Sequence, residues 1–192
     1  MERAAWLERQ FGAQIEWRPF DLHPEYPPEG IPRSELERRY GPGMSDRLAT
    51  MFDQAGLPHA ERLEKVPNSR RSLMLGELAR DRGVLDELHP RLFDAYWARG
   101  LDIGDDGVLV AEGVGVGLDQ AEIVDALGDP GYLERVLAQT REAIELGAGG
   151  VPAWVIDQRL LVPGAQPHEV FTRVMDQLGY PGPSSASSVD PL

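Results

Sequence analysis

The sequence predicts an α/β fold in which one long run of helices separates two groups of strand-forming residues. Residues 15–22 alternate apolar and polar side chains, and residues 153–157 and 160–162 are two short apolar stretches. Such patterns are typical of strands, and the short connection between the last two predicts a hairpin. Residues 34–147, which lie between the two groups, follow a helical pattern and offer no convincing pair of strands.

The N-terminal part predicts one helix, one strand and one loop. Residues 2–11 predict a short helix, since Gly12 follows where a glycine often ends one. In the strand over residues 15–22, Pro19 has no N–H to donate to a ladder, which favours a sheet edge or a bulge. Four prolines and one glycine in residues 24–32 predict an extended loop.

The central and C-terminal parts predict helices around one hairpin. Asn68, Asp119 and Asp129 stand where side chains cap helices. The hairpin near the C-terminus has a two-residue connection, Gln158-Arg159, without the usual glycine. Small, polar and proline-rich residues predict a disordered tail over 180–192. The predicted helices cover residues 34–40, 45–55, 68–82, 85–99, 106–115, 119–127, 130–146 and 167–178.

Composition excludes several classes of function. The chain has 192 residues, about the length of one domain with a large insertion, and 42% of them are hydrophobic. A net charge of −13 disfavours a nucleic-acid partner. No apolar run reaches the length of a membrane helix, and the first residues lack a signal-peptide pattern, so we expect a cytoplasmic protein without a membrane partner.

The sequence contains no cysteine, which decides much of the chemistry. It excludes disulfides, zinc-thiolate sites, iron–sulfur clusters and a cysteine nucleophile within these residues. The four histidines have no metal-ligand spacing, so no metal site is expected. We also expect no bound cofactor.

The order of elements (helix, strand, helical segment, hairpin, helix) is most of a thioredoxin fold. Three segments resemble the DsbA-like thioredoxin family and its cytosolic FrnE-like oxidoreductase branch, to which 2-hydroxychromene-2-carboxylate isomerase and kappa-class glutathione transferases are related. These segments are residues 17–24, 67–73, and 149–157 with 162–167, and the likeness spans roughly residues 1–178.

The resemblance implies a thioredoxin-like domain that is split in two. It implies residues 1–32 and 148–179 for that domain, and residues 33–147 for a large all-helical insertion.

The resemblance also implies a substrate-binding site. Pro152 resembles the family's cis-proline, and the N–H and C=O of Val151 would then face an extended peptide or glutathione. Trp154 would lie behind them, and His23 would lie in a loop nearby. Asn68 falls in a segment that resembles a glutathione-contacting loop. No catalytic residue can be named within the chain.

A strand and a Cys-x-x-Cys loop precede the first helix in members of this family, and here Met1 falls inside that helix. The sequence therefore predicts that the first strand of the fold is missing. Two explanations are open: the native protein is longer by about 15–20 residues, or the remaining strands pair differently. We favour the first. A homodimer that pairs through the open strand edge would supply the backbone partner that the missing strand leaves absent.

Three functions are compatible with these observations. The first is a DsbA- or FrnE-like thiol-disulfide oxidoreductase, redox-silent as given, whose partners are peptides or protein dithiols and disulfides. The second is a glutathione-dependent isomerase or transferase with glutathione as co-substrate. Against the second, residues 164–167 lack the acidic residue that such enzymes place there. The third is a non-catalytic peptide-binding protein.

Overall fold

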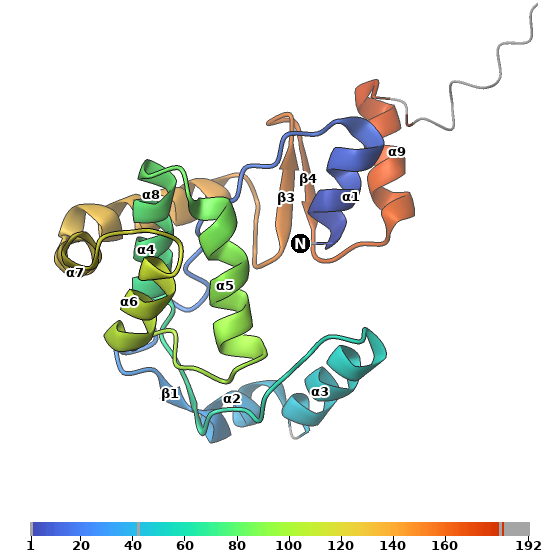
Figure 1. Ribbon diagram of the computed structural model, residues 1–192. Helices are drawn as coiled ribbons and strands as arrows, with labels where there is room; N and C mark the ends of the chain where they lie inside the picture. The colour runs from blue at the N-terminus through green and yellow to red at the C-terminus, as the bar shows by residue number, and fades with distance from the viewer. Residues whose placement is uncertain (1, 42, 181, 183–192) are drawn as a thin grey trace, which may run out of the picture. The chain divides into compact units, whose positions relative to one another are not determined.

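The described residues, 2–41, 43–180 and 182, form nine helices and four short strands in the computed structural model of Figure 1. The helices are α1 (Glu2–Phe11), α2 (Arg33–Tyr40), α3 (Met44–Gln54), α4 (Arg70–Asp81), α5 (Leu85–Trp97), α6 (Asp106–Val114), α7 (Gln120–Gly128), α8 (Pro130–Glu145) and α9 (His168–Leu178). The strands are β1 (Ile31–Pro32), β2 (Lys65–Val66), β3 (Ala153–Ile156) and β4 (Leu160–Pro163).

The chain packs as two units. Residues 21–140 make the larger one, and residues 1–20 with 141–192 make the smaller one, so that α8 runs across the boundary between them. The domain limits expected from the sequence, at residues 32 and 148, remain a prediction. Apart from Tyr180 and Gly182, the predicted disordered tail lies outside the described residues.

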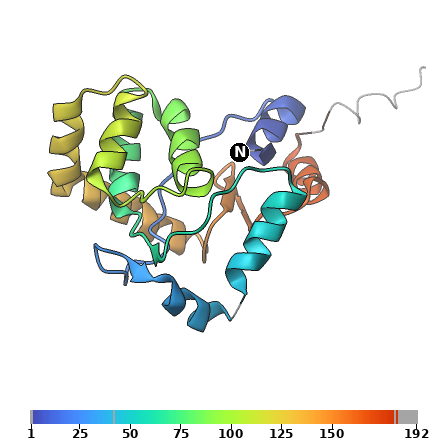
Figure 2. The ribbon, with the colours of Figure 1, turned by 60° about the horizontal axis from the view of Figure 1, so that its bottom comes forward.

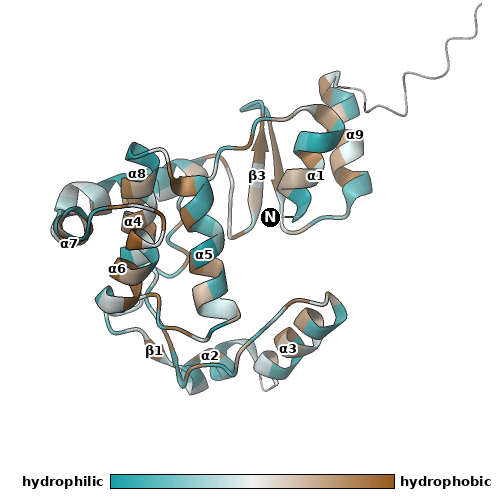
Figure 3. Cartoon of the chain, in the orientation of Figure 1, coloured by the Kyte–Doolittle hydropathy of each residue, from teal (hydrophilic) through white to brown (hydrophobic). Residues whose placement is uncertain are grey.

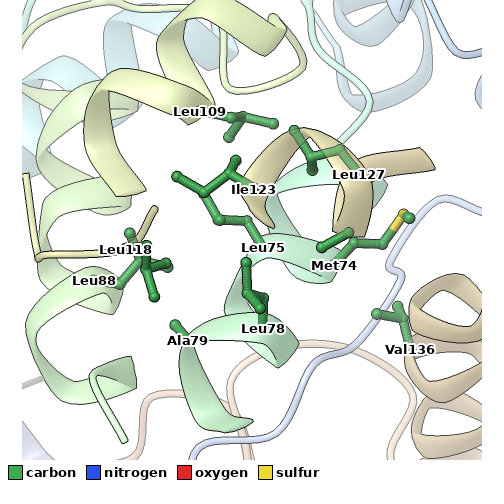
Figure 4. Packing of buried hydrophobic residues seen from close by; sticks show 11 residues of the cluster. Met74, Leu75, Leu78, Ala79, Leu88, Leu109, Leu118, Ile123, Leu127 and Val136 are labelled. Atoms are coloured by element: carbon green, nitrogen blue, oxygen red, sulfur yellow. The ribbon is translucent and has the colours of Figure 1, made fainter. Parts of the chain in front are cut away.

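The larger unit is built around apolar side chains from α4 to α8, and Figures 1 and 2 both show α4 beside α5 and α6. Each helix satisfies its own backbone hydrogen bonds, so its stability depends on burying one apolar face. Figure 4 shows the side chains that gather in this core. Its fully buried members include Leu75, Leu88, Leu109, Ile123 and Val136.

One glycine explains how closely α6 and α7 approach. A Cβ atom at Gly113 would lie 2.6 Å from Cδ1 of Ile123 and 3.4 Å from Cδ1 of Leu75. A larger residue would therefore push into the core. This packing requirement accounts for a glycine inside a helix, where it is otherwise unfavourable.

The larger unit also contains a short ladder that the sequence did not predict. Ile31 pairs with Val66 and Pro32 with Lys65, in antiparallel order. Gly30 precedes this ladder with φ +83°, and a Cβ atom there would lie 2.2 Å from the Val66 carbonyl oxygen. With two residues per strand, this ladder has no alternating pattern long enough to be visible in the sequence.

The smaller unit contains the predicted hairpin of β3 and β4. Trp154 pairs with Val162, and Ile156 pairs with Leu160, so three residues form the connection where the sequence predicted two. Asp157 and Gln158 both have positive φ, and the Arg159 N–H donates to the Ile156 carbonyl oxygen. These are features of a type I′ turn, which matches the twist of paired strands.

The strand predicted over residues 15–22 is not formed. The hairpin sheet consists of β3 and β4 alone among the described strands, and residues 12–20 pair with neither. Ile15 nevertheless packs against the core of the smaller unit, and the Trp17 ring lies 6.4 Å from that of Trp154. The apolar positions were therefore recognised correctly, but a strand also needs a neighbour for its backbone groups.

The core of the smaller unit joins α1, the hairpin and α9. Leu7, Val162, Phe171 and Met175 are its buried members, and Figure 3 shows β3 coloured as mainly hydrophobic. Among the described residues, the helices are all too short or too polar to cross a membrane.

Candidate functional site

The two residues that precede β3 join an exposed valine to a proline. The Val151–Pro152 peptide bond is cis, and Val151 is 55% exposed. The Gly164 N–H donates to the Pro152 carbonyl oxygen at 2.7 Å, which fastens Pro152 to the end of β4. Within the described part of the chain, no group bonds to the N–H or C=O of Val151. A hydrogen bond to either group would have to come from outside the described residues.

Trp154 lies in the core of the smaller unit. Its ring is 5.3 Å from that of Phe171 in an edge-on arrangement, and its indole Nε1 is buried without a hydrogen-bond partner among the described residues. Trp154 therefore supports the hairpin by packing.

Asn68 is a structural residue of the larger unit. Its Nδ2 donates to the carbonyl oxygens of Tyr26 at 2.9 Å and Pro27 at 3.3 Å, and its Oδ1 accepts from the Arg70 N–H at 2.9 Å. The side chain thus fixes the proline-rich loop to the start of α4. The N-cap position of α4 is Ser69, which makes no side-chain cap bond, so Asn68 lies one residue before the position where it was predicted to cap the helix.

His23 lies in that proline-rich region and is held from two sides. Its ring stacks on Tyr26 with centroids 4.4 Å apart, and its Nδ1 lies 3.3 Å from Oε1 of Glu25. Hydrogen bonds from the backbone of Glu25 and from the Arg39 side chain lower the pKa of the Glu25 carboxyl group. The carboxylate therefore stays ionised beside His23 at neutral pH.

His23 and Asn68 meet at a cavity of about 200 Å³ in the larger unit. Asp21 and Tyr26 line the same cavity. Asp21 is buried, its Oδ2 lies 2.7 Å from Nε of Arg70, and its backbone N–H donates to Oγ1 of Thr140. The structure thus brings two of the five predicted substrate-binding residues together, whereas the other three belong to the smaller unit.

Tyr26 and the Asp21–Arg70 pair were not predicted. Asp21 and Arg70 are 49 positions apart, and Tyr26 lies in a loop whose prolines mask any periodic pattern. A buried polar side chain can be recognised in the sequence only when its partners are close along the chain. Among the described residues, no three His, Asp or Glu side chains gather as a metal site would require.

Comparison with known proteins defines the class. The family model described as the DSBA-like thioredoxin domain matches residues 2–176. The chain therefore belongs to the DsbA-like thioredoxin family, and the predicted fold class, an α/β thioredoxin-like domain with a large helical insertion, is confirmed.

Three individual proteins are similar to this chain. The uncharacterized protein YwbO of Bacillus subtilis (strain 168) is 25% identical over 166 residues, which cover 84% of this chain and 80% of YwbO. The crystal structure of the probable DsbA oxidoreductase SCO1869 from Streptomyces coelicolor is 32% identical, with a TM-score of 0.73, over 91% of this chain and 76% of that one. A 2-hydroxychromene-2-carboxylate isomerase is 19% identical, with a TM-score of 0.70, over 93% of this chain and 87% of that one. The likeness to the isomerase shows a shared fold.

Proposed function

We propose that this chain binds the backbone of an extended, cysteine-containing peptide at Val151, as the substrate-binding part of DsbA-type thiol-disulfide chemistry. The observation that carries this proposal is the exposed Val151, whose N–H and C=O bond to no group among the described residues. A peptide that lies along such a segment adds to it as a strand would.

Membership in the family and the similarity to a probable DsbA oxidoreductase support the class of chemistry. The 192 residues contain no cysteine, so any thiol or disulfide that reacts must come from outside them. The chain as given therefore contributes recognition, and it exchanges no disulfide by itself.

The remaining predicted site residues fit this function to different degrees. Pro152 keeps the adjacent Val151 in place through its bond from Gly164, and Trp154 packs beneath the hairpin. Asn68 and His23 remain predicted substrate contacts, and the polar groups of Asn68 already hold the proline-rich loop.

A titration followed by backbone NMR tests the role of Val151. An extended peptide with one central cysteine should shift the Val151 amide signal, and the same peptide with an N-methylated backbone at its centre should bind at least tenfold more weakly. Val151→Pro removes the N–H and should abolish binding, whereas Val151→Ala keeps the backbone and should bind within about threefold. Equal binding of both peptides by a folded protein would refute backbone recognition.

The redox behaviour of the chain has its own test. The 192-residue protein should reduce insulin disulfides no faster than buffer with dithiothreitol, because it has no thiolate. Activity above that blank would show that the sulfur chemistry has been assigned wrongly.

Glutathione is the second candidate ligand of the same backbone site. A chain without cysteine fits a reaction in which glutathione brings the thiol, and the tripeptide can pair with Val151 as a peptide does. Calorimetry with millimolar reduced glutathione tests whether glutathione, rather than an extended peptide, is the ligand of this site. Heat that disappears in Val151→Pro supports the glutathione-dependent function, whereas no heat removes it. Binding of cysteine-free peptides with equal affinity would instead favour a non-catalytic binding protein.

A second copy of the chain is another partner that β3 fits. β3 pairs with β4 along one of its edges, and no other described strand pairs with β3. A strand edge of this kind can pair with an identical chain. Light scattering that gives the mass of a dimer would support this partner, and a clean monomer would remove it.

A further inference from the structure

Residues 43–62 form a segment of the larger unit that buries no side chain. The segment consists of α3 and the loop that follows it, and each of its residues is at least partly exposed. Met44, Leu48 and Met51 lie on one face of α3, and Met51 is 63% exposed. An isolated helix of eleven residues is marginal in water, so the stability of α3 depends on contacts with the rest of the unit.

The chain on both sides of this segment is held in place. Before it, α2 follows β1 directly, and after it, β2 pairs with β1. The Arg33 N–H also donates to the Glu64 carbonyl oxygen at 2.8 Å. Gly43, where the segment begins, has φ +75°, a conformation that suits glycine best. The segment thus leaves and re-enters the unit at two fixed points, and we call residues 43–62 the flap.

The flap docks on Trp97, the last residue of α5. The Phe52 ring stacks on the Trp97 ring with centroids 5.0 Å apart, and the guanidinium carbon of Arg62 lies 4.0 Å from the centroid of the same indole ring. The Ala60 N–H donates to the Trp97 carbonyl oxygen at 2.9 Å. Residues from α3 and from the loop therefore converge on one residue of α5.

The docked position of Arg62 is electrostatically costly. Its Nη1 and Nη2 atoms are buried and have no hydrogen-bond partner among the described residues. Burial lowers the pKa of this guanidinium, which nevertheless stays protonated at neutral pH. The attraction between the cation and the Trp97 ring opposes the cost of burying the charge without an acceptor. Since Arg62 regains water when the flap undocks, the docked and open states should be close in free energy.

We propose that residues 43–62 open as one unit, with Trp97 as the latch, while the core of the 21–140 unit stays folded. Opening uncovers the rings of Trp97 and Phe52, which face each other in the docked state. The flap and its latch lie in the 21–140 unit, whereas Val151 lies in the other unit, so this device is separate from the function proposed above.

Amide hydrogen exchange followed by NMR tests the flap. The amides of α3 should share one protection factor, at least about a hundredfold below that of Leu75 in α4, because an undocked α3 loses the contacts that stabilise it. Phe52→Ala should lower protection about tenfold both in α3 and at Ala60, and leave Leu75 unchanged. Met51→Ala, at the exposed neighbouring position, is the matched control and should change protection less than about threefold.

A variant on the other side of the contact tests whether Trp97 is the latch. Trp97→Leu should lower protection in α3 as Phe52→Ala does, and the double variant should lower it no further, because both changes remove the same ring contact. Circular dichroism confirms that each variant is folded. Three results would overturn the proposal: equal protection of α3 and Leu75, a loss in Phe52→Ala that does not reach Ala60, or an equal loss in Met51→Ala and Phe52→Ala.

Discussion

The two units of this chain differ in how completely each one satisfies its own backbone. The 21–140 unit surrounds α4 with other helices and buries large apolar side chains completely, among them Leu75, Leu109 and Ile123. The smaller unit has four buried core residues and a hairpin of four-residue strands, and residues 12–20 run beside that core without pairing.

This difference follows from where each type of element finds its hydrogen bonds. A helix forms them within itself, so a helical unit is complete once its apolar faces meet. A strand depends on a neighbour that is far away in sequence, so a sheet with few strands leaves backbone groups open. In the same unit, the N–H and C=O of Val151 bond to no group among the described residues.

The largest effect should come from the core of the smaller unit. Phe171 is fully buried and contacts Trp154, so Phe171→Ala should lower the free energy of unfolding by about 3–5 kcal/mol. Urea titrations followed by tryptophan fluorescence report mainly on this unit, which holds Trp6, Trp17 and Trp154, while the fourth tryptophan, Trp97, lies in the larger unit. Phe93→Ala, at an exposed phenylalanine, is the control and should cost less than about 1 kcal/mol. If Phe171→Ala lowered the free energy of unfolding no more than Phe93→Ala does, this small core would not be a source of stability.

Leu109→Ala removes a buried side chain from the core of the larger unit and should lower the free energy of unfolding by about 3 kcal/mol. Leu109 belongs to α6 and is fully buried in the core of the larger unit. Val124 on α7 is exposed, so the control Val124→Ala should leave the free energy of unfolding nearly unchanged. Amide hydrogen exchange sharpens the comparison. Faster exchange confined to residues 21–140 would show that the units unfold separately, and equally faster exchange in α9 would show that they unfold together.

The same contrast explains what could be predicted from the sequence. The helices and their caps depend on residues a few positions apart, and Asp119 indeed accepts from the N–H groups of Ala121 and Glu122. The prediction of a strand over residues 15–22 was wrong because a strand forms only with a partner, and that partner is distant in sequence. At the candidate site, Val151 and Pro152 were found by family resemblance, whereas the Asp21–Arg70 pair became visible only when the fold brought the two residues together.

Asn68 provides a smaller effect that tests how the proline-rich loop is held. Asn68→Ala removes three hydrogen bonds and leaves the Tyr26 carbonyl oxygen and the Arg70 N–H without their partner, which should cost about 2 kcal/mol. Ser72→Ala removes one bond, from its Oγ to the Ser69 carbonyl oxygen, and should cost about 1 kcal/mol or less. Thermal unfolding measures both. If the order were reversed, the loop would not depend on Asn68.

The smallest effect concerns the surface of the larger unit and depends on pH. Two bonds from the Arg135 guanidinium to the Asp81 carboxylate lower the pKa of that group. A depressed pKa stabilises the fold at pH values above the unfolded pKa of about 3.9, and the stabilisation is lost as the pH falls through the folded value. Because this pair is partly exposed, Asp81→Asn should cost about 1 kcal/mol or less at pH 7.

The pH profile of Asp81→Asn distinguishes this cause from a loss of packing. The difference between native protein and variant should shrink as the pH falls from about 4 through the depressed folded pKa of Asp81, because the unfolded chain takes up the proton first; below the folded value both proteins carry a neutral side chain at this position. Asp125→Asn on α7 is the matched control, since Asp125 is exposed and has no ion pair among the described residues. A difference for Asp81→Asn that stays constant from pH 7 to pH 2 would mean that the carboxylate charge contributes nothing and that its contacts act by shape alone.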